Sequence, residues 1–92
     1  MSAAWIIDRD VCADPSARPG TNANAVGVAG PRGYRGDGSE LACRFRMYDD
    51  DDNLLYEGRA SEVSFAPLDD FAAPNAGCTR IAFRIRGRWE TL

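Results

Sequence analysis

Two segments of the chain alternate apolar and polar side chains with the period of a β-strand. In residues 41–48 and 80–86, every second side chain is apolar, and most of those between are arginine. Successive side chains of a strand point to opposite faces, so this alternation predicts two half-buried strands. The predicted inward set is Leu41, Cys43, Phe45, Met47, Ile81, Phe83 and Ile85.

Further strands are predicted around these two segments. The apolar and β-branched run "AWIIDRDV" at residues 4–11 favours a strand. Residues 54–60 are predicted to return from residues 41–48 as a hairpin, because the Asp-Asn cluster between them favours a turn. Their inward set is Leu54, Tyr56, Gly58 and Ala60. Gly87 is expected in a tight turn that leads to a terminal strand carrying Trp89.

The remaining segments are rich in turn-forming residues. Residues 23–30 favour either a short strand or a helical turn, and residues 65–78, which contain two prolines, have room for one helical turn. In "GVAGPRGYRGDG" a glycine recurs at every third position, but four triplets with one proline are too few for a collagen triple helix. We interpret this stretch, with its Arg-Gly-Asp tripeptide at residues 35–37, as a Gly-rich surface loop at about residues 27–39.

These elements predict a mainly β fold, or an α+β fold with very short helices. A chain of 92 residues forms one domain, and strands with one polar face are typical of antiparallel sheets. We therefore expect a small, single antiparallel β-rich domain over residues 1–92, either a curled sheet or a small barrel. The chain has no long apolar run and no basic signal region at its start, so we expect a cytoplasmic protein without a membrane partner.

The charged residues argue against an enzyme. All eleven basic residues are arginine, and there is no histidine, so the usual proton shuttle and the imidazole metal ligand are missing. The formal net charge of −3 argues weakly against nonspecific binding of nucleic acids, because such binding depends on excess positive charge.

The three cysteines predict neither a disulfide framework nor a zinc site. Cys12, Cys43 and Cys78 are about thirty residues apart, and no Cys-x-x-Cys pair occurs. We expect reduced thiols, with Cys43 as a small buried apolar residue, and leave open a single bridge between Cys12 and Cys78. No cofactor and no metal ion are predicted.

The most acidic stretch lies at the predicted hairpin turn. A calcium loop of the EF-hand type that began at Asp49 would need Gly and Glu where the chain has Leu54 and Ala60, so that motif fails. The stretch is either a solvated hairpin tip or a contact surface for a basic partner. The aspartates near residue 70 either add to this negative end or cap a helical turn. The candidate acidic partner-binding residues are Asp49, Asp50, Asp51, Asp52, Asp69 and Asp70.

A basic surface is predicted on the polar face of the strands. If residues 41–48 and 80–86 are neighbours, their arginines gather on one sheet face, where Tyr48 or Trp89 could stack on a base. Glutamates at positions 57, 62 and 90 could instead neutralise them. The alternative partner-binding set is Arg44, Arg46, Arg80, Arg84 and Arg86.

Three stretches, "GTNANAVGVAGPRG", "FRMYDDDDNLLYEGR" and "PLDDFAAPNAGCTRI…GRWETL", resemble a group of short bacterial or phage-type proteins with no described function. The likeness covers most of the chain and assigns no role to any residue.

The leading hypothesis is a non-catalytic binding protein whose acidic tip contacts a basic macromolecular partner. One version is an inhibitor from a mobile element, of the anti-CRISPR or anti-restriction type, that imitates phosphate charge. The alternatives are a nucleic-acid-binding module that uses the arginine face, and a structural or assembly protein of a phage or bacterium. The oligomeric state is left open.

Overall fold

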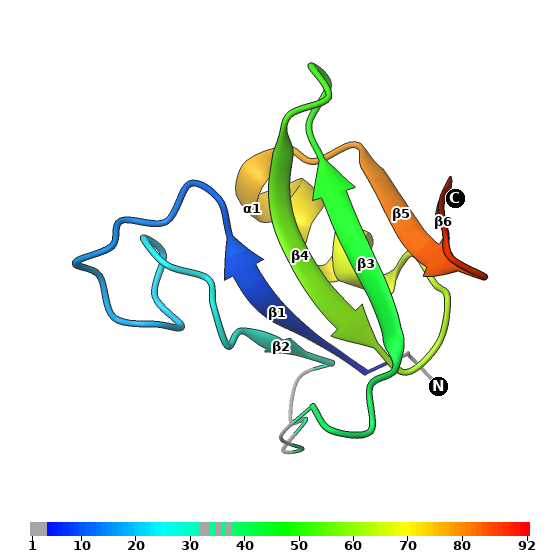
Figure 1. Cartoon of the computed structure of the whole chain (residues 1–92). Coiled ribbons are helices and arrows are strands. Elements are labelled where there is room, and N and C mark those ends of the chain that lie inside the picture. Colours follow the sequence, from blue (N-terminus) through cyan, green and yellow to red (C-terminus); the bar gives the residue numbers. More distant parts are fainter. Residues whose placement is uncertain (1–3, 32–33, 35, 37) are drawn as a thin grey trace.

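The computed structural model describes residues 4–31, 34, 36 and 38–92, and it contains one antiparallel sheet (Figure 1). Its strands are β1 (Trp5–Asp10), β2 (Ala29–Gly30), β3 (Cys43–Tyr48), β4 (Leu54–Ala60), β5 (Arg80–Ile85) and β6 (Arg88–Thr91). The strand order is β2-β1-β4-β3-β5-β6, with β2 and β6 at free edges. The predicted β-rich domain is thus confirmed as an open sheet and not as a closed barrel. Of the predicted Gly-rich loop, residues 32–33, 35 and 37 lie outside the described residues, as do residues 1–3.

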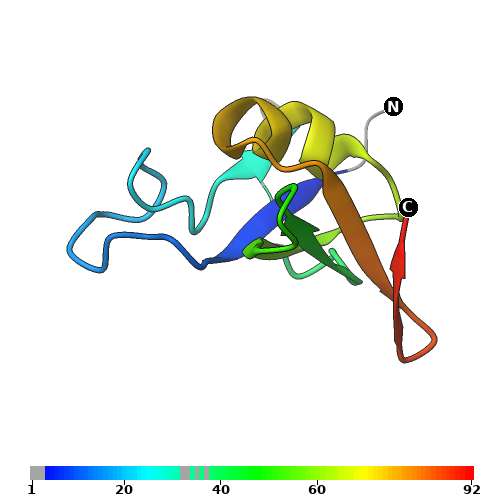
Figure 2. The ribbon, with the colours of Figure 1, turned by 90° about the horizontal axis from the view of Figure 1, so that it is seen from above.

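A short helical segment covers one face of this sheet. It consists of η1 (Leu68–Ala72), a π-helical turn, and α1 (Ala73–Ala76), which follows directly. Pro74 lies in the first turn of α1, where an N–H group needs no helical partner. Gly77 ends α1 with a left-handed φ of 69° and donates its N–H to the Ala73 carbonyl. Figure 2 shows this segment on one side of the sheet, and we call the uncovered side, which faces the viewer in Figure 1, the open face.

The predicted alternation in β3 and β5 is confirmed by burial. Between the sheet and the helical segment, Phe45, Met47, Ile81 and Phe83 are each at most 1% exposed. Phe45 and Phe83 are cross-strand partners with ring centroids 5.8 Å apart. Burying a side chain of this size stabilises the fold by roughly 1.5–3 kcal/mol, so these four residues are a main source of stability.

Gly58 on β4 fixes how closely β1, β3 and β4 pack. It lies opposite Phe45, and a Cβ atom added to it would be 2.6 Å from the Phe45 ring and would collide with the Ile6 carbonyl oxygen. The missing side chain therefore makes the space that the Phe45 ring fills.

Residues 23–30, for which the sequence left strand and helix open, end in the two-residue strand β2. None of the helices among the described residues has the length and apolar character needed to cross a membrane.

Candidate functional site

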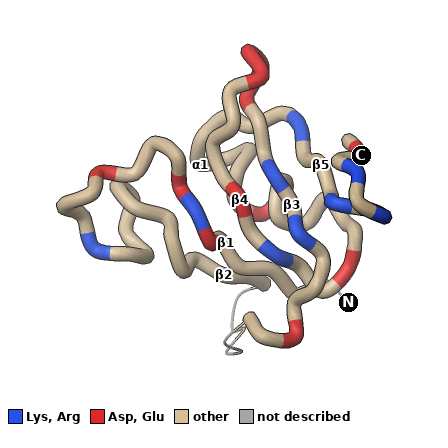
Figure 3. Tube along the Cα trace, viewed as in Figure 1, with Lys and Arg blue, Asp and Glu red and all other residues tan. Residues whose placement is uncertain are grey.

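Of the nine arginines that the structure describes, six lie on the open face. Each one lies on a strand, on the side opposite to the core residues, and Figure 3 shows the basic positions following β1, β3, β4 and β5. Tyr48 and Trp89 are on the same face because they pair with two of these arginines. The six are Arg9, Arg44, Arg46, Arg59, Arg80 and Arg84.

Three of these arginines form a line across neighbouring strands. Arg59 on β4 is the direct cross-strand partner of Arg44 on β3. The register that pairs Phe45 with Phe83 places Arg84 on β5 beside Arg44. Neighbouring strands are about 4.8 Å apart, and like charges directly opposite each other destabilise a sheet. We call Arg59, Arg44 and Arg84 the arginine row; nothing in the packing of the core requires it.

A β-bulge in β1 supplies a counter-charge that is bonded to the arginine row. The register with β4 shifts between Ile7 and Arg9, so Asp8 and Arg9 both reach the open face. Asp8 accepts two hydrogen bonds from Arg59, at 2.7 and 2.9 Å, and Arg59 also donates to the Gly38 carbonyl at 2.9 Å. Among the described residues, no ion pair engages Arg44 or Arg84.

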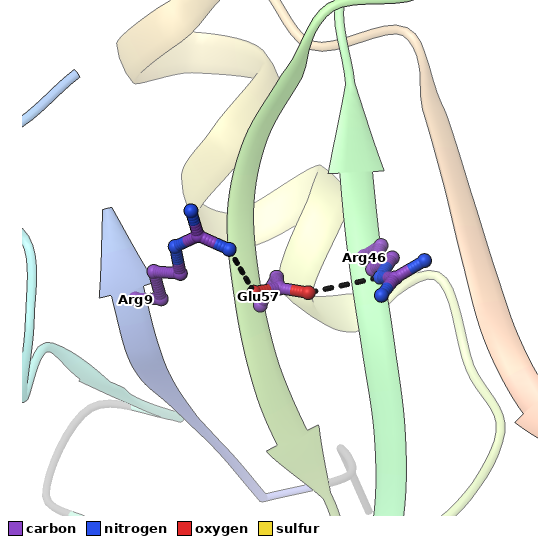
Figure 4. Close-up of polar contacts among 3 residues, drawn as sticks. All are labelled: Arg9, Arg46 and Glu57. Carbon is purple, nitrogen blue, oxygen red and sulfur yellow. Dashed lines mark hydrogen bonds and ion pairs between the residues drawn. The ribbon is translucent and has the colours of Figure 1, made fainter. Parts of the chain in front are cut away.

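A second line across the strands alternates in charge. Glu57 on β4 accepts from Arg9 on β1 at 3.0 Å and from Arg46 on β3 at 2.9 Å (Figure 4). Partial burial opposes ionisation of Glu57, but the hydrogen bonds from the two arginines outweigh this effect and lower its pKa below the ordinary value. The hydrogen bond to Glu57 likewise raises the pKa of Arg46. Glu57 therefore holds both arginines in place as an ionised carboxylate.

Trp89 on β6 lies close to two guanidinium groups. The Arg46 guanidinium carbon is 4.1 Å from the centre of the Trp89 ring system, and that of Arg84 is 5.6 Å away. Both distances are in the range of cation–π attraction. The predicted grouping of these arginines with Trp89 is thus present in the structure.

Two other predicted arginines are placed differently from the rest. Arg80 pairs with Asp52 of the β3–β4 turn at 2.6 Å and lies over the Tyr48 ring at 4.4 Å, so it is held at the end of the sheet. Arg86 was predicted to point outward from a strand, and this is wrong. It lies in the β5–β6 turn with a φ of 51°, because the chain reverses immediately after Ile85.

The predicted counter-charges are also partly corrected. Glu57 pairs with arginines as expected, whereas Glu62 and Glu90 make no ion pair with a described residue. Glu90 pairs with Phe83 in the register and so points away from the open face. Sequence reasoning missed Asp8 and Arg9, since a bulge interrupts the period of two at that point.

The acidic turn between β3 and β4 uses two of its four aspartates internally. One carboxylate oxygen of Asp49 accepts from the backbone N–H groups of Asp51 and Asn53, and the other accepts from the Asn53 side chain. The bonds from Asn53 lower the pKa of Asp49. Asp52 has a φ of 62° and pairs with Arg80. Only Asp50 and Asp51 are exposed side chains without a described ion pair or hydrogen bond of their own.

Asp69 and Asp70 lie in the first turn of η1, across the covered face of the sheet, while the β3–β4 turn extends past one end of it (Figure 1). The structure therefore does not bring the two acidic groups together. η1 begins without a side-chain cap hydrogen bond, so the predicted capping bond is absent as well.

The three cysteines are free thiols, and the bridge between Cys12 and Cys78 that the sequence left open is not formed. Cys12 is exposed, whereas burial raises the pKa of the Cys78 thiol to about 11. Within the described part of the chain, no three acidic or cysteine side chains gather in a way that could hold a metal ion.

Comparisons with protein-family models, with curated proteins and with solved structures found no match. The resemblance to short bacterial or phage-type proteins therefore stays a prediction.

Proposed function

We propose that this protein is a non-catalytic binding module that holds single-stranded nucleic acid on its open face. The observation that carries the proposal is the arginine row, in which like charges are neighbours on three strands. Among the described residues, the six arginines of the open face form ion pairs with three carboxylates, those of Asp8, Asp52 and Glu57, so the arginines outnumber their described acidic partners by three. A bound polyanion would reduce the repulsion between these neighbouring arginines, because the fold itself leaves that repulsion in place.

The open face is a sheet surface, which favours a single strand over a duplex. A helix or a narrow β-ribbon enters the grooves of duplex DNA, whereas sheet surfaces bind single strands through backbone charge and aromatic side chains. Arginine suits this role because its planar fork donates two parallel hydrogen bonds to one phosphate. The uncovered strands offer arginines at steps of about 4.8 Å across the sheet.

The test is the binding of a labelled oligonucleotide, about 12 nucleotides long, followed by fluorescence anisotropy as salt is raised. The variant Arg44→Ala/Arg84→Ala removes the two members of the arginine row that form no described ion pair. Because each phosphate contact to a single strand contributes about 0.7 to the slope of log K against log salt, the variant should lose about 1.4 of that slope.

The matched control is Arg18→Ala/Arg88→Ala, which changes the net charge equally but removes arginines that lie off the open face. This control should bind like the unaltered protein. Equal losses in the two variants, or no binding at low salt, would overturn the proposal. Preference for duplex over single-stranded DNA would also contradict it.

A second candidate function is that of a phosphate-mimicking inhibitor. It is favoured by the carboxylates of Asp50 and Asp51, which are exposed at a projecting turn and have no described ion pair or hydrogen bond (Figure 3). Replacing all four aspartates would break the turn and the Asp52–Arg80 pair, so the clean variant is Asp50→Asn/Asp51→Asn. Mimicry predicts that the protein binds an arginine-rich peptide, that this variant weakens the binding, and that a Glu62→Gln/Glu90→Gln control does not. Retention of oligonucleotides by the unaltered protein would count against mimicry and for the first proposal.

A further inference from the structure

On the open face, two cations converge on one aromatic ring. The guanidinium carbons of Arg46 and Arg84 both lie within 6 Å of the centre of Trp89, although the two arginines come from different strands. Among the residues that the structure describes, Glu57 is the one carboxylate bonded to either of them, and Glu57 is shared with Arg9. The ring thus gathers more positive charge than the neighbouring side chains neutralise.

The small residue beneath these side chains explains how they reach one another. Ala82 lies on β5 between Arg46 on β3 and Thr91 on β6. It is only 4% exposed, although it faces away from the core cluster and no described helix covers it. Its cover must come from the side chains of the open face itself, and Arg46 and Trp89 are among the large ones near it. A bulky residue at this position would hold them apart.

Arg46 is held in a fixed orientation from two sides. Its Nε atom donates to Glu57 at 2.9 Å, and its guanidinium lies over the Trp89 ring. Tyr48 contributes a second side-chain hydrogen bond that raises the pKa of Arg46, while Arg84 has no ion-pair partner among the described residues. A guanidinium with its Nε engaged and its plane packed on a ring loses little freedom when its outer edge binds an anion.

We propose that Arg46 and Arg84 form a clamp for one phosphate group, with Trp89 as its support. The clamp rests on the proposed function, in which it would hold one backbone phosphate of the bound strand. Phosphate is the ligand chemistry that fits, because each guanidinium can donate two parallel hydrogen bonds to its oxygens and the charge excess matches an anion.

The two tryptophans provide a test with an internal control. The indole N–H signals of Trp5 and Trp89 are followed by heteronuclear NMR in the unaltered protein while inorganic phosphate replaces chloride at constant ionic strength. Assignment uses the Trp89→Phe variant. The Trp89 signal should shift until it saturates, and that of Trp5, which is 3% exposed in the core, should not.

Charge-conserving variants distinguish a phosphate clamp from general electrostatic attraction between the arginines and phosphate. Arg84→Lys keeps the charge but lacks the planar fork, so phosphate should bind at least about fivefold more weakly, whereas Arg88→Lys should leave the affinity unchanged. The clamp is refuted if the Trp89 signal shows no saturable shift, if Arg84→Lys binds as tightly as the unaltered protein, or if acetate saturates the site as well as phosphate does.

The clamp and the proposed function fail in different ways. Oligonucleotide binding that depends on Arg44 without any phosphate shift at Trp89 would overturn the clamp and leave the proposed function standing. A saturable phosphate shift without oligonucleotide binding would support the clamp and overturn the nucleic-acid proposal.

Discussion

The charge-alternating line Arg9–Glu57–Arg46 gives the sharpest prediction about stability. Changing Glu57→Gln removes the carboxylate that two arginines share but keeps the shape of the side chain and one acceptor oxygen. Both arginines remain on the open face, where they then repel each other without the carboxylate that lay between them.

The expected loss in the free energy of unfolding follows from how exposed Glu57 and its two arginine partners are. The Arg9 side chain is 62% exposed, so solvent screens its pair with Glu57 and its contribution is close to nothing, about 0.2 kcal/mol. Arg46 and Glu57 are 33% and 21% exposed, which places their pair at the upper end for surface ion pairs, about 1 kcal/mol. The free energy of unfolding should therefore fall by about 1 kcal/mol, and the Tm by roughly 4–8 °C for a domain of this size.

The measurement is urea unfolding of the unaltered protein and of Glu57→Gln, with Glu90→Gln as control because that residue makes no described ion pair. The folded protein lowers the pKa of Glu57, so its contribution is complete above the pKa of the unfolded chain, about 4.3. As the pH falls through the lower, folded value, the carboxylate is protonated and the contribution disappears. The difference between the two proteins should thus be full at neutral pH and shrink in acid.

Two results would refute this reasoning. A difference that persists unchanged in strong acid would mean that the loss comes from packing of the glutamine and not from charge. An unchanged stability at neutral pH and low salt would mean that the line of ion pairs contributes nothing to the fold.

Three further outcomes are expected. Gly58→Ala should destabilise the fold by about 1–3 kcal/mol in urea unfolding, since its Cβ would meet backbone and a core ring, and a neutral result would show that β4 can shift away. Asp49→Ala should lower the free energy of unfolding more than Asp50→Ala does, because it frees three turn donors; equal effects in urea unfolding would contradict the assigned turn. At mildly alkaline pH, iodoacetamide should modify exposed Cys12 quickly and Cys78, with its pKa of about 11, only after unfolding, as mass spectrometry of the peptides would show.

The parts of the fold that the sequence predicts are those where one periodicity holds without interruption. In β3 and β5, side chains alternate over six residues in each strand, so the core residues around Phe45 and Phe83 could be named in advance. The bulge at Asp8 depends on how β1 and β4 pair, which a single strand does not reveal. Arg86 continues the alternation in the sequence, yet Gly87 and the positive φ of Arg86 turn the chain first.

The candidate site was predictable only in part, for a related reason. Alternation places Arg44, Arg46 and Arg84 on one face, but the strand order decides which of them are neighbours. Asp49 and Asp52 at the acidic turn show the same limit of prediction from sequence. Asp49 accepts from a backbone N–H group two residues away, and Asp52 accepts from an arginine on another strand. Composition indicates charge, and only the register shows which charges are already neutralised.

The net charge of −3 does not conflict with an anion-binding face, because distance decides which charges count. At physiological salt the Debye length is about 8 Å, longer than the step of about 4.8 Å between neighbouring strands. The members of the arginine row would therefore act together on a phosphate bound according to the proposal. The protein measures 35 × 33 × 22 Å, so many of its other charges, such as those at the far end of the β3–β4 turn, lie beyond that length and are screened. A bound anion would therefore respond to the local excess of the open face and not to the net charge of the whole protein.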